Sequence, residues 1–155
     1  MGFALPASIG VAFAAPGQPL AVVAGDGSFQ LNSQELHTVA HNSLPIKMLI
    51  LNNRSYGMVR QFQQSYFKER YQSTCWGYSV PDFVAVARAY GLASARVVKP
   101  EQVETALARM WHNPAEPYLL EIMIDTSANA YPKIAFGKPF TEMEPFARPD
   151  EMKST

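Results

Sequence analysis

The sequence has no excess of either charge, almost no cysteine and no long apolar run. Lysine and arginine together number 13, as do aspartate and glutamate, so the formal net charge is zero. A nucleic-acid-binding chain usually shows a basic excess or stripe, so this balance argues against nucleic acid as a partner. The single cysteine, Cys75, can form neither an internal disulfide nor a thiolate metal site, so nothing requires an oxidising compartment.

Signals for membrane insertion or export are also lacking. No apolar run reaches the roughly 18 residues that a membrane-spanning helix needs. Residues 1–15 are apolar and rich in alanine, as in a signal peptide, but they lack a positively charged leading segment and Pro6 interrupts them. We interpret this stretch as a buried helix and predict a cytoplasmic location without membrane contact.

Motifs for two common ligand types are missing as well. Neither GxxxxGK[ST] nor GxGxxG occurs, which argues against nucleotide sites built on those loops. His37 and His41 lie four residues apart, but Thr38 replaces the glutamate that the zinc motif HExxH requires. We therefore expect ordinary helix histidines at these positions.

What the chain does contain is a rhythm of short apolar runs and helical stretches. The 155 residues are 48% hydrophobic and 17% charged, which is typical of one globular domain. Four apolar runs bounded by turn residues predict buried strands, and the stretches between them have helical spacing and capping residues, including Asn32 with Glu35 in capping-box spacing. The predicted strands are 20–24, 46–51, 95–98 and 118–124, and the predicted helices are 5–15, 33–41, 81–90 and 101–111.

This alternation predicts an α/β fold of three layers, α/β/α, around a mainly parallel sheet. Residues 65–80 are rich in aromatic and polar side chains and predict a long functional loop over a site. From residue 126 onward prolines recur without a period. We therefore predict an α/β domain over residues 1–125 and an extended arm over 126–155 that packs on the same domain.

Polar residues follow two of the predicted strands. Asp26 lies between Gly25 and Gly27 after the first strand, and Asn53 follows the second, 27 positions later. The carboxyl ends of parallel strands meet at one edge of a sheet, where such folds bind ligands. Carboxylate and amide oxygens suit Mg²⁺, glycines admit a phosphate, and the predicted helices after Asn32 and Ser55 would offer amide-rich N-termini. These residues predict a Mg²⁺-diphosphate site.

The motif GDGS followed at this interval by LNN resembles the fingerprint of thiamine-diphosphate enzymes. MGFALPASIG, QELHTVAHNSLPIKMLILNNRSYGMVRQFQ, PDFVAVARAYG and PKIAFGKPFTEMEP extend the likeness to the C-terminal domain of acetolactate synthase-type enzymes. The resemblance covers nearly the whole chain. It implies the thiamine-diphosphate-binding fold, incomplete at its N-terminus, and an enzyme of branched-chain amino-acid biosynthesis that decarboxylates a 2-oxo acid such as pyruvate and joins the product to a second one.

The resemblance also implies roles for individual residues. Asp26 would ligate Mg²⁺ through its carboxylate, Asn53 through its amide oxygen and Ser55 through its backbone carbonyl. Met1 matches the bulky residue that holds the cofactor in its bent shape. The implied cofactor-binding residues are Met1, Gly25, Asp26, Gly27, Ser28, Asn53, Ser55, Tyr56, Gly57 and Met58, and the implied substrate pocket is Met58, Val59 and Phe62.

Other parts of such enzymes are expected outside these residues. In this family, the glutamate that activates the cofactor lies on an N-terminal domain of a partner subunit, so the resemblance implies no catalytic residue here and an inactive chain on its own. It implies further N-terminal domains and a homodimer or tetramer as the parent, and some members also bind FAD in a middle domain.

Two positions depart from the biosynthetic type and leave alternatives open. Phe62 stands where tryptophan is usual, and Tyr56 where glutamine is frequent. The chain could therefore belong to another thiamine-diphosphate decarboxylase or lyase, and a non-catalytic assembly domain with the same fold is the rival from a different class.

Overall fold

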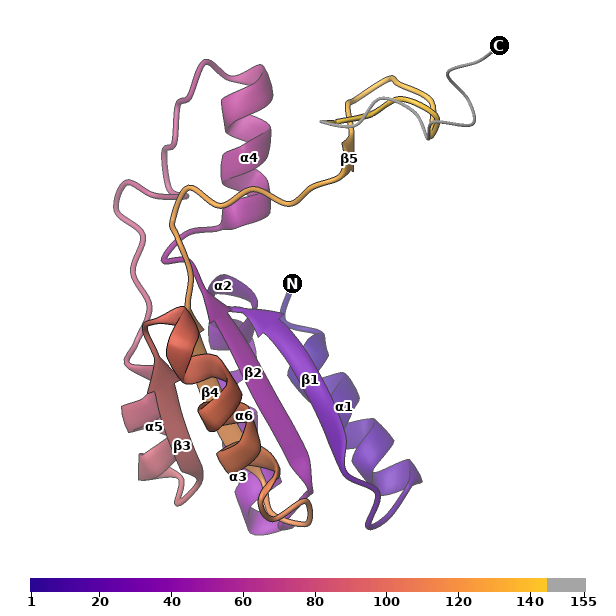
Figure 1. Cartoon of the computed structure of the whole chain (residues 1–155), viewed down its shortest axis with the longest axis vertical. Coiled ribbons are helices and arrows are strands. Elements are labelled where there is room, and N and C mark those ends of the chain that lie inside the picture. Colours follow the sequence, from indigo (N-terminus) through magenta and orange to yellow (C-terminus); the bar gives the residue numbers. More distant parts are fainter. Residues whose placement is uncertain (145–155) are drawn as a thin grey trace.

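A parallel sheet of four strands organises the chain. The computed structural model describes residues 1–144, and the strand order is β1-β2-β4-β3, with all three pairings parallel (Figure 1). The strands are β1 (Leu20–Gly25), β2 (Ile46–Asn52), β3 (Ala93–Val97) and β4 (Tyr118–Met123). The four strands predicted from the sequence are confirmed, with shifts of one or two residues at their ends.

Helices cover both faces of this sheet, which gives the predicted three layers. The helices that flank it are α1 (Ala4–Ala14), α3 (Leu36–His41), α5 (Phe83–Ala89) and α6 (Val103–Trp111), the last preceded by the 3₁₀ helix η2 (Pro100–Gln102). On one face, α1, α3 and α5 enclose the larger core, in which Ile46, Met48 and Ile50 of β2 are fully buried. On the other face, α6 packs over β3 and β4 around Met110 and Leu120 (Figure 1).

Strand β2 lies inside the sheet, between β1 and β4, and is mainly apolar because most of its side chains are buried; its polar residues are Lys47, which is 1% exposed, and Asn52 at its end. Every second residue enters the larger core, and Leu49 on the opposite face packs against the smaller one. The helix α6 does not extend over β1. Val23 of β1 is consequently 58% exposed, and Leu51 of β2 is 36% exposed on the same face. These apolar side chains form part of the site described below.

The segment after β1 differs from the prediction. A short helix α2 (Asp26–Phe29) begins directly at the strand end, and a 3₁₀ helix η1 (Gln30–Glu35) leads into α3. The predicted capping box at Asn32 is wrong, because Asn32 lies at a kink inside η1 and its side chain donates to the carbonyl of Gly2 at 2.6 Å. Glu35 instead accepts a bond from Thr38. The α-helix α3 therefore begins at Leu36, three residues later than predicted.

Beyond the carboxyl ends of the strands, helix α4 (Gly57–Tyr66) stands apart from the sheet (Figure 1). The predicted loop 65–80 begins after this helix, two residues later than expected, and runs irregularly to α5, where Asp82 caps the helix through the Ala85 N–H at 3.0 Å. The segment after β4 crosses back to α4. It carries a two-stranded antiparallel ribbon, β5 (Lys133–Ile134) and β6 (Met143–Glu144), that the sequence did not predict. Residues 145–155 of the predicted arm lie outside the described residues.

Candidate functional site

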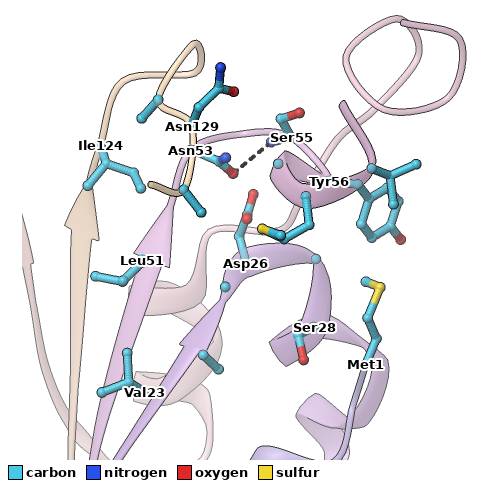
Figure 2. A pocket seen from close by; sticks show the side chains of 18 residues that line it. Met1, Val23, Asp26, Ser28, Leu51, Asn53, Ser55, Tyr56, Ile124 and Asn129 are labelled. Carbon is cyan, nitrogen blue, oxygen red and sulfur yellow. Dashed lines mark hydrogen bonds between the residues drawn. The ribbon is translucent and has the colours of Figure 1, made fainter. Parts of the chain in front are cut away.

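A cavity of about 520 Å³ lies at the carboxyl ends of β1 and β2, under the start of α4. Figure 2 shows that its walls come from these strand ends, from α2, from the chain start and from the segment after β4. The lining residues are Met1, Val23, Ala24, Gly25, Asp26, Gly27, Ser28, Leu51, Asn53, Ser55, Tyr56, Gly57, Met58, Val59, Ile124, Ala128, Asn129 and Ala130.

The polar end of the cavity is built around Asp26. Gly25, the last residue of β1, pairs with Leu51 of β2. The segments that follow the two strands therefore leave the sheet side by side. Asp26 is 1% exposed, and no basic side chain among residues 1–144 pairs with it. Burial raises the pKa of Asp26 from its ordinary value, although the backbone N–H of Gly27 and the hydroxyl of Tyr78 oppose that effect. Such a buried, unneutralised carboxylate is suited to a cation.

Asn53 and Ser55 face Asp26 from the end of β2 (Figure 2). The side-chain oxygen of Asn53 accepts a hydrogen bond from the Ser55 N–H at 3.2 Å, and both residues are buried. Gly57 is required at its position because a Cβ there would lie 2.5 Å from the amide nitrogen of Asn53. The turn between β2 and α4 therefore holds the amide and the backbone of Ser55 close to the carboxylate.

A hydrogen-bond network across β2, β4 and β3 supports the turn between β2 and α4. Buried Glu121 of β4 accepts from the Asn52 amide at 2.7 Å and from Nε of Arg96 at 2.6 Å. Asn52 in turn accepts from the backbone N–H of Arg54 at 2.9 Å, and Arg54 has a positive φ of 53°. Glu121 thus positions the residue before Asn53, a role that the sequence analysis missed because Glu121 sits within a strand, 69 residues away.

The chain start is tied to α2 beside the polar end. The backbone N–H of Gly2 donates to the hydroxyl oxygen of Ser28 at 2.9 Å, and Ser28 and Met1 both line the cavity. Gly27 lies directly against the side chains of two tyrosines. A Cβ at this position would come within 2.4 Å of the Tyr56 ring and 2.9 Å of the Tyr78 hydroxyl. Only glycine therefore fits at the centre of the GDGS turn.

The rest of the cavity is mostly apolar. Val23 of β1, Leu51 of β2 and Ile124, which directly follows β4, line it, and sequence reasoning had assigned none of them to the site. Met58 and Val59 of α4 lie on the wall as predicted positions of the substrate pocket. Phe62, one helical turn further on, is absent from the lining of this cavity. It lines a neighbouring depression between α4 and residues 133–136.

The remaining wall, residues 128–130, is held in place by α4. Nη2 of the buried Arg60 donates to the backbone carbonyls of Ser127 and Ala128 at 2.9 and 3.1 Å and to the side chain of Asn129. Gln61 and Ala130 exchange two hydrogen bonds of 3.0 and 3.1 Å. These polar side chains of α4 face away from solvent because they anchor the segment after β4, a signal that the sequence pattern did not reveal.

The donor set at the polar end fits Mg²⁺ and a phosphate group together. One carboxylate, one amide oxygen and nearby backbone oxygens are hard ligands, and Mg²⁺ in such sites uses few protein ligands and completes its shell with phosphate oxygens and water. Within residues 1–144, no group of three or more His, Cys, Asp and Glu residues could hold a metal ion by itself. His37 and His41 stack on each other on α3, away from this cavity.

Comparison with known proteins identifies the class. Residues 1–122 match the family model described as "Thiamine pyrophosphate enzyme, C-terminal TPP binding domain". The chain therefore belongs to the C-terminal, cofactor-binding domains of thiamine-diphosphate enzymes, and thiamine diphosphate is the cofactor of this class. A solved structure, the thiamine diphosphate-dependent 4-hydroxybenzoylformate decarboxylase of Rhodococcus jostii RHA1, superposes with a TM-score of 0.71 at 30% identity, over 83% of this chain and 24% of that one.

Curated relatives are acetolactate synthases. The isozyme 2 large subunit of Escherichia coli (strain K12) is 42% identical over 92% of this chain and 26% of its own length. The large subunit of Cyanidium caldarium is 41% identical over 92% and 24%, and acetolactate synthase 2, chloroplastic, of Zea mays is 38% identical over 92% and 23%. The chain spans about a quarter of the length of these relatives. No helix within residues 1–144 is both long and apolar enough to cross a membrane.

Proposed function

We propose that the cavity binds the diphosphate of thiamine diphosphate through Mg²⁺, with Asp26, the side-chain oxygen of Asn53 and the backbone carbonyl of Ser55 as metal ligands. The observation that carries this proposal is the buried carboxylate of Asp26, unpaired with any described basic group, opposite Asn53 and Ser55 at the ends of two parallel strands. Ser28 and the backbone of Gly25, Gly27 and Gly57 would accommodate the phosphates.

The apolar part of the cavity would hold the organic part of the cofactor. Met1, Tyr56 and Met58 line it beside the polar end, and Val23, Leu51 and Ile124 extend it along the sheet. When bound, thiamine diphosphate supplies an electron sink for breaking the bond between a 2-oxo group and its carboxylate. In this proposal, the described residues that line the cavity bind and orient the cofactor.

At the level of the whole enzyme, we propose an acetolactate synthase-like activity on 2-oxo acids such as pyruvate, with a second subunit and further domains completing the site. The names of the curated relatives support this activity, and "large subunit" in several of them supports a multi-subunit enzyme. A homodimer or tetramer and a cytoplasmic location belong to the same proposal, although some plant relatives carry the word chloroplastic in their names.

The substrate pocket is proposed to include Met58 and Val59, which are 68% and 46% exposed at the cavity wall. Phe62 would reach the substrate only from the neighbouring depression, where Tyr66 packs on it at 4.7 Å between ring centroids. We further propose that residues 1–125 form the α/β unit and that the following segment is its arm. The hydrogen bonds of Arg60 and Gln61 to residues 127–130 support this division.

Calorimetric titration of thiamine diphosphate into the 155-residue chain tests the proposal, once with Mg²⁺ and once with EDTA. The expected result is binding that requires the metal. Binding that is indifferent to EDTA would contradict the metal-ligand assignment. If no binding is seen even after the N-terminal domains of a relative are supplied, the non-catalytic assembly domain becomes the better interpretation.

A further inference from the structure

A tyrosine outside the sequence motif contacts the central carboxylate of the site. Tyr78 lies 52 residues after Asp26, in the irregular segment between α4 and α5, and its hydroxyl donates to Oδ2 of Asp26 at 3.1 Å. We infer that Tyr78 is a positioning residue that orients the Asp26 carboxylate for the metal ion. This inference rests on the proposed function, since it assigns a role toward the proposed Mg²⁺.

The segment that carries Tyr78 is fastened to the metal-binding turn at several points. The backbone N–H of Tyr56 donates to the carbonyl of Thr74 at 3.1 Å, and the Thr74 hydroxyl donates to the side chain of Gln63 at 2.5 Å. Ser55 Oγ lies 3.4 Å from Cys75 Sγ. Thr74 is 3% exposed, so these contacts are shielded from water. The Tyr78 hydroxyl is therefore presented from a segment that is anchored to residues 55–63.

The ring of Tyr78 also contacts the site, in addition to the hydrogen bond that its hydroxyl makes. It meets the ring of Tyr56 edge-on, with centroids 4.7 Å apart and an interplanar angle of 69°. The two rings leave no room for a side chain at Gly27, the residue after Asp26. The contact with Tyr56 supports the ring in the position from which its hydroxyl reaches Oδ2.

The hydrogen bond from Tyr78 orients the carboxylate and uses part of its acceptor capacity. An ionised carboxylate offers about four acceptor sites, and Tyr78 occupies one of them on Oδ2. Backbone N–H groups of Gly27, Asp26 and Ser55 also interact with this carboxylate, and a cation would use the acceptor capacity that these bonds leave. Groups that orient a metal ligand in this way typically account for about 10- to 100-fold in metal affinity. Tyr78 is not among the residues that line the cavity, so its role toward the metal would act through Asp26.

The test compares Tyr78→Phe with Tyr90→Phe in the 155-residue chain. Tyr90 packs its ring near His37, and within residues 1–144 its hydroxyl has no hydrogen-bond partner. Mg²⁺ is titrated calorimetrically in the presence of thiamine diphosphate, and thermal melting is measured in EDTA. We expect Tyr78→Phe to weaken Mg²⁺ binding about 10-fold with little change in the metal-free melting temperature, and Tyr90→Phe to leave the affinity unchanged.

A second pair of variants keeps the Tyr78 hydroxyl and changes the backbone next to it. Gly77 and Gly17 have positive φ values of 75° and 76°, and neither has any atom within 4 Å of the position of an added Cβ. Alanine is strained equally at both. Gly77→Ala displaces the residue next to Tyr78, whereas Gly17→Ala acts at the far end of the sheet. We expect only Gly77→Ala to reduce Mg²⁺ affinity, although both variants lose stability.

The outcomes separate the inference from the proposed function. Wild-type chain that binds Mg²⁺ with the cofactor, together with unchanged or tighter binding in Tyr78→Phe, overturns the role of Tyr78 and leaves the proposed function intact. A loss of affinity that merely follows a matching drop in the metal-free melting temperature also overturns it, because Tyr78 would then be only structural. Wild-type chain without metal-dependent binding, even with the missing domains supplied, overturns both.

Discussion

Replacing Asp26 by asparagine separates the folding of this chain from its proposed metal binding. Among the residues that line the cavity, Asp26 is the only one with a charged side chain. Asparagine has nearly the same shape but no charge. Burial raises the pKa of Asp26, so the ionised carboxylate costs the metal-free native state free energy. We therefore expect Asp26→Asn to melt no lower than wild type in EDTA at neutral pH.

The effect of ligand can be given a size. Ligand at about 100 times its dissociation constant stabilises a protein by about 2.7 kcal/mol, and in a domain of this length 1 kcal/mol shifts the melting temperature by about 2–4 °C. Wild type should therefore gain roughly 5–11 °C. If losing the charged ligand weakens binding about 100-fold, the same ligand concentration stabilises Asp26→Asn by only about 0.4 kcal/mol, or about 1 °C.

The assay is thermal melting followed by circular dichroism, with Mg²⁺ and thiamine diphosphate and again with EDTA. Asp82→Asn is the matched control, because Asp82 is the exposed N-cap residue that precedes α5 and lies outside the cavity. It should lose a little stability and keep the full ligand shift. An undiminished ligand shift in Asp26→Asn would refute the assignment of Asp26 as a metal ligand.

Two further predictions concern Gly27 and Asp82. In Gly27→Ala, the new Cβ would come within 2.4 Å of the Tyr56 ring, so we expect a loss of about 1–3 kcal/mol and weaker cofactor binding by calorimetry. Gly10→Ala on the open surface of α1 should instead be neutral or stabilising, and equal behaviour of the two would contradict the packing argument. Asp82→Ala should cost about 1 kcal/mol through loss of the α5 cap. The bond from the Ala85 N–H lowers the pKa of Asp82 below 3.8, so this stabilisation is complete above that pH and is lost as the pH falls through the lowered pKa. In urea unfolding, the free energies of unfolding of wild type and Asp82→Ala should converge as the pH falls. A difference that stays constant with pH would exclude the cap.

The sheet could be predicted because its signal is local. Strand β2 is largely buried, so five of its first six residues are apolar, with Lys47 as the exception, and the polar residues Asn52 and Asn53 mark its end. The same reasoning placed Asp26 and Asn53 at neighbouring strand ends, and the cavity includes both. Pairing in a parallel sheet requires little more than that each strand be followed by a helix that returns the chain.

The prediction of a capping box at Asn32 failed because the side chain bonds to a distant backbone group. Asn32 followed by Glu35 has the spacing of a capping box, yet the Asn32 amide bonds to the carbonyl of Gly2, 30 residues earlier. The bond to this distant carbonyl holds the Asn32 side chain, Asn32 lies at a kink inside η1, and the α-helix begins at Leu36 instead. Phe62, which the resemblance assigns to the substrate pocket, lines the depression between α4 and residues 133–136, and its contact with substrate stays a prediction.

The positions of the strands, their parallel direction and the residue types at the two strand ends followed from the amino-acid sequence alone, because hydrophobic periodicity and turn residues act between near neighbours. The strand order β1-β2-β4-β3 did not, because it depends on how the strands pack together. The support of the site did not follow. The bonds from Tyr78 to Asp26, from Asn52 to Glu121 and from Arg60 to residues 127–129 join positions 52 to 69 residues apart. No local pattern specifies which polar group meets which across such a distance. Those partners are set when the sheet, α4 and the two long segments pack together.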